Sequence, residues 1–450
     1  MSISIYGLIL FILGAIAQLK KPKFIIYVLV ISSVFGAASA VDLAGKPILP
    51  GIFMLGFLSL YMSRVKDIDK YVTYEFKNNS SVGYLFVFTI YSCLASLFLP
   101  KYFAGEVWVY NLLDGVFVEQ LLFFSGSHIA QIFYMIATFL FFLTVVILVR
   151  QYKYMIVFAN AFLVVGVINI AFGISDLFFY NLGMTDYLAY LKNANYAIVD
   201  QSMSGIRRIA GSFSETSGFS GYTGGLLAFS FFLYRSGYRK RLSGFVAFFS
   251  FLLLILATSS SGYVCLATLS VVLIITERNY ILKGLLTKGA FLTLVTTFFV
   301  SCTLMLLFSE QVLSIVDSAI LNKLDSSSGI ERSEWNASAW DNFQKTYGFG
   351  VGLGGNRASS FIMVLLSNVG WFGLIIYALF FISVILGKHT HDDRVYNVIS
   401  GAATAAIIVM FVPSLFVATS AFKGVLFCIL LPIAASSVKL DGVSRSYYHA

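Results

Sequence analysis

The chain has 450 residues and a formal net charge of +9 at pH 7; 59% of its residues are hydrophobic and only 11% are charged. Soluble domains are about 45–50% apolar and about 25% charged, so this composition excludes a water-soluble fold for almost all of the chain. The basic residues lie between apolar runs rather than on one face, which argues against nucleic-acid binding. We therefore expect one integral membrane domain over residues 1–450.

The apolar runs predict an all-α polytopic membrane protein with about 13 transmembrane helices, because a helix needs about 20 mostly apolar residues to span a bilayer. In chain order, the predicted spans are 3–18, 24–42, 48–63, 82–99, 129–149, 154–177, 219–234, 242–257, 261–276, 288–308, 359–386, 397–417 and 423–437. Three residues separate 242–257 from 261–276. These two segments form either a tight helical hairpin or one broken helix.

The distribution of charge predicts the orientation, because Lys and Arg are enriched on the cytoplasmic side. An outer N-terminus and a cytoplasmic C-terminus give the inside a charge of +13 (20 basic, 7 acidic) and the outside −4 (10 basic, 14 acidic). The long loops 100–128, 178–218 and 309–358 then lie outside, and the last carries short amphipathic helices. Every inner loop is too short for an independent domain, and the sequence contains no Walker A motif, which argues against a primary pump.

Cysteine and histidine usage predicts no metal site and no cofactor. The cysteines form no CxxC pair, and the histidines form no set with ligand spacing. All four cysteines lie in apolar segments, where they are expected to be small buried residues: Cys93, Cys265, Cys302 and Cys428.

Four arginines on the outer side go against the charge preference: Arg207, Arg208, Arg332 and Arg357. A guanidinium is well shaped to bind phosphate oxygens with two parallel hydrogen bonds. The alternative is that each is a solvated loop charge or pairs with an outer carboxylate.

The first two arginines open the segment 207–218, which is rich in small residues. Arg208 and Glu215 flank its turn, where a bulky ligand could approach the backbone. The alternative is a salt bridge between these two residues that fixes the loop. Asp176, near an outer helix end, is a carboxylate that could line a polar cavity.

The second motif, 326–335, begins a predicted amphipathic helix. Ser328 and Glu331 have the spacing of a capping box. The apolar stripe of this helix is Trp335, Ala339 and Phe343. We expect the helix to lie on the outer membrane surface, with Trp335 and Trp340 as interfacial anchors.

The third motif is the glycine-rich segment 348–358, directly before the predicted span at 359. Glycine turns at a helix N-terminus can present backbone N–H groups to an anion. The sequence therefore predicts a pyrophosphate cradle formed by Gly352, Gly354, Gly355, Ser359 and Ser360. The alternative is a flexible loop that turns into the membrane.

Four pieces in order make residues 205–385 resemble the O-antigen polymerase and O-antigen ligase superfamily of bacterial inner-membrane proteins. They are Arg-x-x-Gly-x-Phe-x-Glu at 208–215; Ser-Ser-Gly at 260–262; Arg332 with Trp335; and Gly-x-Gly-x-Gly-x-x-Arg-x-Ser-Ser at 350–360, followed by Asn-x-Gly at 368–370. The resemblance implies a metal-independent, inverting glycosyltransferase that works at the outer leaflet. Its donor would be a glycan on undecaprenyl pyrophosphate.

Ligases of this superfamily carry a His-Asn pair where the last outer loop enters its span. Here these positions are Ser359 and Ser360, which favours a polymerase of repeat units for O-antigen, capsule or exopolysaccharide. The alternatives are a ligase that transfers glycan to lipid A-core and a lipid-linked oligosaccharide flippase. The implied partners are donor and acceptor glycans on the lipid carrier, membrane lipid, and a chain-length regulator and flippase of the same pathway.

The resemblance and the chemistry of the residues together predict the site. Arg208, Arg332 and Arg357 would bind the pyrophosphate of the donor and stabilise its charge as it leaves. Arg207 would bind the pyrophosphate of the second lipid. Glu215 is the predicted base that accepts the proton of the attacking hydroxyl.

Overall fold

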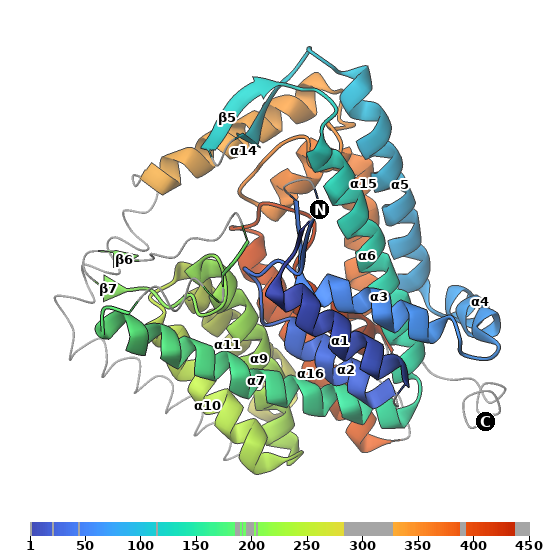
Figure 1. The fold of residues 1–450 in the computed structure, drawn as a ribbon, viewed down its shortest axis with the longest axis vertical. Coiled ribbons are helices and arrows are strands. Elements are labelled where there is room, and N and C mark those ends of the chain that lie inside the picture. Colours follow the sequence, from blue (N-terminus) through green and yellow to red (C-terminus); the bar gives the residue numbers. More distant parts are fainter. Residues whose placement is uncertain are drawn as a thin grey trace.

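The computed structural model describes residues 2–19, 22–43, 46–113, 116–184, 190, 192–194, 202–203, 206–282, 327–387 and 393–436. These residues form helices and a few short strands (Figure 1). The helices are α1 (Ile5–Leu19), α2 (Pro22–Ser32), α3 (Pro50–Met62), α4 (Ile68–Asn78), α5 (Ser80–Tyr102), α6 (Gly126–Val149), α7 (Tyr152–Asn181), α9 (Thr216–Ser236), α10 (Lys240–Leu256), α11 (Ser260–Leu282), α14 (Ser327–Lys345), α15 (Phe361–Ile385), α16 (Arg394–Ser414) and α17 (Val425–Ala435).

The strands form three small antiparallel sheets. Strands β1 (Ser2–Ile3), β2 (Val41–Leu43) and β3 (Lys46–Ile48) pair in that order. The hairpin of β4 (Trp108–Leu113) and β5 (Val116–Leu121) lies within the predicted outer loop 100–128. The third sheet is β6 (Ser202–Met203) with β7 (Ile206–Arg207).

Helices lie over twelve of the thirteen predicted spans, and the remaining span, 288–308, lies outside the described residues. Five described helices, α5, α6, α7, α15 and α16, are long and apolar enough to cross a membrane. Several shorter helices, including α1, α3 and α17, are also apolar. An all-α fold with helices that suit a membrane is therefore confirmed for the described residues.

Two predicted segments differ in detail from the structure. The span 24–42 is too long, because α2 ends at Ser32 and the chain continues through turns into β2. The segments 242–257 and 261–276 form two helices, α10 and α11, joined by a turn in which Thr258 has a φ of 47°. The site of a Cβ on Gly262 lies 3.3 Å from the carbonyl oxygen of Leu254, so the two helices are close at this turn.

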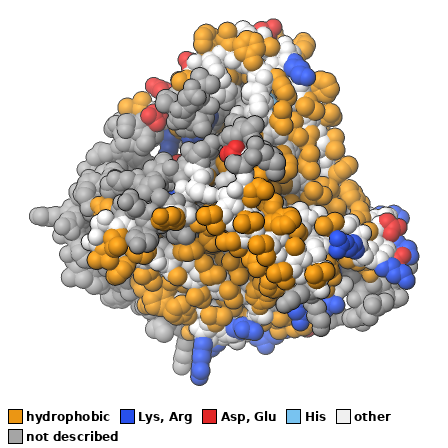
Figure 2. Space-filling model, in the orientation of Figure 1, with side chains coloured by type: hydrophobic (Ala, Val, Ile, Leu, Met, Phe, Trp, Pro, Cys, Tyr) orange, Lys and Arg blue, Asp and Glu red, His pale blue; other side chains and the backbone are white. Residues whose placement is uncertain are grey.

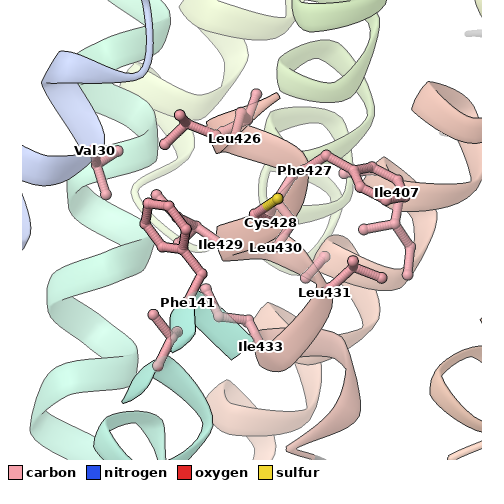
Figure 3. Packing of buried hydrophobic residues seen from close by; sticks show 14 of the residues in the cluster. Val30, Phe141, Ile407, Leu426, Phe427, Cys428, Ile429, Leu430, Leu431 and Ile433 are labelled. Atoms are coloured by element: carbon pink, nitrogen blue, oxygen red, sulfur yellow. The ribbon is translucent and has the colours of Figure 1, made fainter. Parts of the chain in front are cut away.

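The last helix is the centre of the hydrophobic core. All 11 residues of α17 are buried, as expected for a helix that is apolar on every side. Figure 3 shows its side chains beside Val30 of α2, Phe141 of α6 and Ile407 of α16, which are distant in sequence. The core therefore ties the two halves of the chain into one bundle.

The two ends of the bundle differ in character. At the top of Figure 1, α14 crosses the bundle beside the β4–β5 hairpin. Helix α4 projects from the bundle at the lower right, away from α14. On the face drawn in Figure 2, hydrophobic side chains cover most of the visible body, while Lys and Arg gather along the lower edge and around α4. We refer below to the α14 end, which carries the candidate site.

Candidate functional site

The loop that leads into α9 is held by one buried carboxylate, that of Asp176 in α7. Its Oδ2 accepts the backbone N–H groups of Ala210 (2.7 Å) and Gly211 (2.8 Å). Its Oδ1 accepts the Nε (3.0 Å) and Nη2 (2.7 Å) of Arg207. Asp176 is fully buried and Arg207 is 4% exposed. This carboxylate fixes the backbone just before the Arg208–Glu215 turn.

These contacts change the interpretation of Arg207 and Asp176. The guanidinium of Arg207 lies against the Tyr180 ring (5.2 Å to the centroid) and its charge is paired inside the protein. In this structure Arg207 is therefore already paired, and its binding of the pyrophosphate of a second lipid stays a prediction. Asp176 has no exposed surface, so it binds the loop rather than lining a polar cavity.

Arg208 has very different surroundings. It is half-buried, and its buried Nε has no hydrogen-bond partner among the described residues. Burial lowers the pKa of Arg208, and the charge of Arg332 lowers it further, while Glu215 and Tyr263 act in the opposite direction. These groups therefore lie close enough to influence one another. The predicted salt bridge to Glu215 is absent among the described ion pairs, and Glu215 Oε2 instead accepts the hydroxyl of Ser217 (3.1 Å).

The last arginine of the predicted set, Arg357, lies on the face of an aromatic ring. Its Cζ is 4.4 Å from the ring centroid of Trp335, which is only 8% exposed. Burial lowers the pKa of Arg357 to about 10; the charge of Glu215 opposes this shift and that of Arg332 adds to it. Arg357 thus shares its electrostatic neighbours with Arg208.

The charges of Arg332, in α14, and of Glu215, in the loop before α9, therefore act on both Arg208 and Arg357, from the loops before α9 and α15. Arg332 is half-buried and forms no ion pair with a described carboxylate. Arg208 and Arg332 carry like charges in a partly buried position, which is costly when neither forms an ion pair. Such a cluster is suited to bind an anion.

The glycine-rich segment packs against the helices around it. Gly352 N–H donates to the carbonyl of Asn368 (2.8 Å), and Gly355 N–H donates to the carbonyl of Gly352 (3.0 Å). Gly352 and Gly354 have positive φ (82° and 87°). A Cβ on Gly352 would lie 2.8 Å from Ser96 Cα, and one on Gly354 would lie 2.6 Å from a backbone oxygen of α6. These glycines let the loop pack against helix backbones, and the pyrophosphate cradle of Gly352, Gly354 and Gly355 stays a prediction.

Two asparagines and a kink fix this loop to α15. Asn368 Nδ2 donates to the carbonyl of Asn356 (3.0 Å), and its Oδ1 accepts the N–H of Asn356 (3.2 Å). At Gly370 the backbone leaves the helical conformation (φ 65°, ψ −170°), and Trp371 N–H reaches the carbonyl of Gly348 (3.1 Å). The Asn-x-Gly sequence at 368–370 is thus explained by loop docking.

Ser359 and Ser360 also have structural partners. Ser360 Oγ accepts the N–H of Met363 (3.3 Å), as an N-cap of α15. Ser359 is buried, and its N–H donates to Asn336 Oδ1 of α14 (2.9 Å). Neither contact supports the predicted role of these serines in binding pyrophosphate. They position α14 and Arg357 relative to α15.

Sequence reasoning missed three neighbours of the cluster. Tyr263 acts on Arg208, Glu331 acts on Arg357, and Trp335 supports Arg357 from below. Trp335 was predicted as a membrane anchor and is buried instead, whereas Trp340 is 45% exposed. The apolar stripe predicted for α14 could have pointed to the burial of Trp335, because it includes Trp335 and Ala339, which are both buried in the structure.

The described residues contain no group of three or more His, Cys, Asp or Glu side chains that could hold a metal ion. Comparison of the chain with models of protein families, with curated proteins and with solved structures finds no match. The chemistry of the arginine cluster, defined as Arg208, Arg332 and Arg357 with Glu215, is therefore the feature that points to a function.

Proposed function

We propose that this protein is a polysaccharide polymerase that joins oligosaccharide repeat units carried on undecaprenyl pyrophosphate into O-antigen, capsule or exopolysaccharide. It would be a member of the O-antigen polymerase and ligase superfamily and a metal-independent, inverting glycosyltransferase. The site of reaction would be the α14 end of the bundle.

One observation carries this proposal: the half-buried Arg208 lies within reach of the positive charge of Arg332, and neither guanidinium forms an ion pair with a described carboxylate. A diphosphate is the anion that best matches several guanidinium groups, since each can bind two of its oxygens. Arg357, held on Trp335, supplies a third guanidinium. In a partly buried position these charges act more strongly than in water.

In the proposed reaction, a hydroxyl oxygen of the acceptor sugar attacks the anomeric carbon of the donor glycan. The bond from that carbon to the diphosphate oxygen breaks, and the diphosphate leaves with the electron pair. The arginine cluster stabilises the negative charge that develops on this oxygen. Glu215 accepts the hydroxyl proton. The charge of Glu215 acts on both Arg208 and Arg357, which supports this role.

The proposed location is the outer face of the bacterial inner membrane, with about 13 spans, an outer N-terminus and a cytoplasmic C-terminus. The collection of basic side chains around α4, away from the arginine cluster, supports this orientation (Figure 2). The segment 309–358 would be the large outer loop. Donor and acceptor lipids, membrane lipid, a chain-length regulator and a flippase would be the partners.

Two alternatives have less support. A ligase of the superfamily would need a His-Asn pair at Ser359 and Ser360, and segment 309–358 contains no histidine. A flippase should have charges along a path through the middle of the membrane. The buried charged residues of the described chain lie instead at helix ends or in loops: Glu75, Arg150, Asp176, Lys192 and Arg207.

The test is reconstitution of the purified protein in liposomes with synthetic lipid-linked repeat units. Longer glycans would support a polymerase, whereas relocated lipid without chain growth would support a flippase. We expect Arg332→Gln to slow chain growth by about 10²- to 10³-fold. The control is Lys345→Gln on the same helix, because Lys345 is exposed and paired with Asp341. Equal rates for Arg332→Gln and Lys345→Gln would contradict the proposal.

A further inference from the structure

The glycine-rich segment lies beside α15 rather than above its end. At Gly370, the tenth residue of this helix, the backbone leaves the helical conformation. The carbonyl of Ser367 accepts the N–H of Val351 (2.8 Å). The carbonyl of Asn368 accepts the N–H of Gly352 at the same distance. Because a helix rises 1.5 Å per residue, these contacts lie on the order of 10 Å along α15 from its first residue.

The same segment packs against the side of α5. Leu353 N–H donates to Ser96 Oγ (2.8 Å), and α5 continues to Tyr102. Leu94 and Phe98, on either side of Ser96 in the sequence, are both exposed. Both α5 and α15 are long and apolar enough to cross a membrane. The segment therefore lies at a level where the neighbouring helix carries apolar side chains on its surface.

The backbone of this segment is not helical, yet its donors are satisfied inside the protein. Each backbone N–H from Tyr347 to Leu353 donates to a protein oxygen. For example, Gly350 N–H donates to Thr346 Oγ1 (2.9 Å). Non-helical backbone is tolerated at membrane depth only where its polar groups have such partners. The segment therefore needs no water to complete these hydrogen bonds.

The side chains that surround the break in α15 form an aromatic face. The aromatic face consists of four exposed residues: Tyr347, Phe349, Trp371 and Phe372. The site of a Cβ on Gly348 lies 3.1 Å from Trp371 Cδ1, so the segment and the break share one surface. The ring of Phe372 also contacts Tyr91 of α5 (4.8 Å between centroids). The aromatic face therefore joins the segment to the exposed sides of both helices.

The aromatic face continues into an apolar stripe on α15. Ile375, Leu379 and Ile382 are exposed and follow Trp371 at helical spacing. On a helix that crosses a membrane, such a stripe faces lipid. Trp and Tyr rings combine an apolar body with a polar tip and are enriched where acyl chains meet headgroups. Bilayer lipid is therefore the partner that fits this surface.

We propose that residues 347–352 form a re-entrant loop whose aromatic face contacts the lipid of the bilayer. The hydrogen bonds to α5 and α15 fix its backbone, so it is an ordered part of the membrane domain. The inference goes beyond the proposed function, because it concerns how the protein contacts the membrane and holds for any reaction at the arginine cluster.

The test measures tryptophan fluorescence of the full-length protein in phosphatidylcholine liposomes. One quencher is phosphatidylcholine brominated on its acyl chains, and the other is iodide in the water. The chain has four tryptophans, so replacing the other three with Phe leaves Trp371 as the reporter. A second reporter is Phe349→Trp in a protein whose native tryptophans are all replaced with Phe. The matched control is Ala337→Trp in that background, because Ala337 is exposed on α14 between the exposed Glu334 and Asp341.

We expect brominated lipid to cause a large loss of emission from Trp371 and from the Phe349→Trp reporter, and iodide to cause little. The Ala337→Trp control should show the reverse order. Quenching of both reporters by iodide alone would overturn the inference, since the aromatic face would lie in water. Protection from both quenchers would also overturn it, because protein, such as a second copy of the chain, would then cover the face.

Two features keep this test decisive. Trp371 is a native residue, so it reports even if Phe349→Trp does not fold. The measurement needs no substrate and no chain growth. A protein that fails to polymerise can therefore still show lipid contact at the aromatic face, and the two proposals can fail separately.

Discussion

The guanidinium of Arg357 lies on the indole ring of Trp335, with 4.4 Å between Cζ and the ring centroid. The two residues come from different segments, α14 and the loop before α15, which Ser359 N–H and Asn336 Oδ1 hold together at 2.9 Å. Arg357 lies in a loop, so the contact with Trp335 fixes the orientation of its side chain. We infer that Trp335 sets the position of the positive charge in the cluster.

Trp335→Leu should slow chain growth by about 2- to 30-fold, since a partly buried cation–π contact contributes about 0.5–2 kcal/mol. Trp335→Phe should retain most of the rate, because the ring face remains. Rates in liposomes measure this. Trp340→Leu, at a position that is 45% exposed, serves as the control. Equal rates of chain growth for Trp340→Leu and Trp335→Leu would refute the claim that Trp335 positions Arg357.

Asp176→Asn should destabilise the folded protein by about 3–5 kcal/mol, because it leaves the buried charge of Arg207 without its partner. Thermal unfolding in detergent measures the change. Replacing both residues, as Asp176→Asn/Arg207→Gln, should restore part of the loss. Asp341→Asn is the control, since its side chain is 52% exposed and its pair with Lys345 is solvated. A loss for Asp176→Asn no larger than for Asp341→Asn would contradict the account of the loop.

Gly352→Ala should prevent normal folding, because its Cβ would lie 2.8 Å from Ser96 Cα at a φ of 82°. Gly105→Ala separates the two causes: its φ is 76°, but nothing lies within 4 Å of the added Cβ. We expect the control to lose only the about 1–2 kcal/mol of left-handed strain. Thermal unfolding compares the two variants. A Gly352→Ala protein that folds normally but loses diphosphate binding would support the cradle interpretation.

The stability of the folded protein should depend on pH because Lys192 is buried. Burial lowers its pKa to about 8, with the nearby charge of Asp176 opposing this shift and that of Arg207 adding to it. From about pH 8 to 10.5 the unfolded chain keeps the proton that the folded protein has released, so the free energy of unfolding should rise with pH. The rise amounts to about 3 kcal/mol. Denaturant unfolding should show this rise in the wild type and not in Lys192→Met. Identical pH profiles of the two proteins would contradict the prediction.

Much of the helical layout was predictable, because runs of apolar residues are long and well separated by charged loops. The structure places α6 at Gly126–Val149, where the sequence predicts a span over 129–149. Lengths were harder where a helix ends inside an apolar run. Ser32 and Ser33 hydroxyls donate to carbonyls three residues back, and α2 stops there although the run continues.

The site was predictable only in part, since residue type does not reveal a distant partner. Arg207 and Arg208 are adjacent and chemically equal, yet Arg207 is paired with Asp176, 31 residues upstream, and Arg208 forms no ion pair with a described carboxylate. The glycine run presents the same problem. Its composition suits an anion cradle or close packing equally, and only the structure shows its packing contacts with Ser96 and Asn368.

The most direct test of the central claim measures the affinity of the purified protein in nanodiscs for a short-chain polyprenyl diphosphate. The account predicts that Arg208→Gln/Arg332→Gln binds the diphosphate about 100-fold more weakly, because two charge-assisted contacts disappear. It also predicts that inorganic pyrophosphate competes at this site. Unchanged affinity in the double variant would contradict a diphosphate site formed by these arginines.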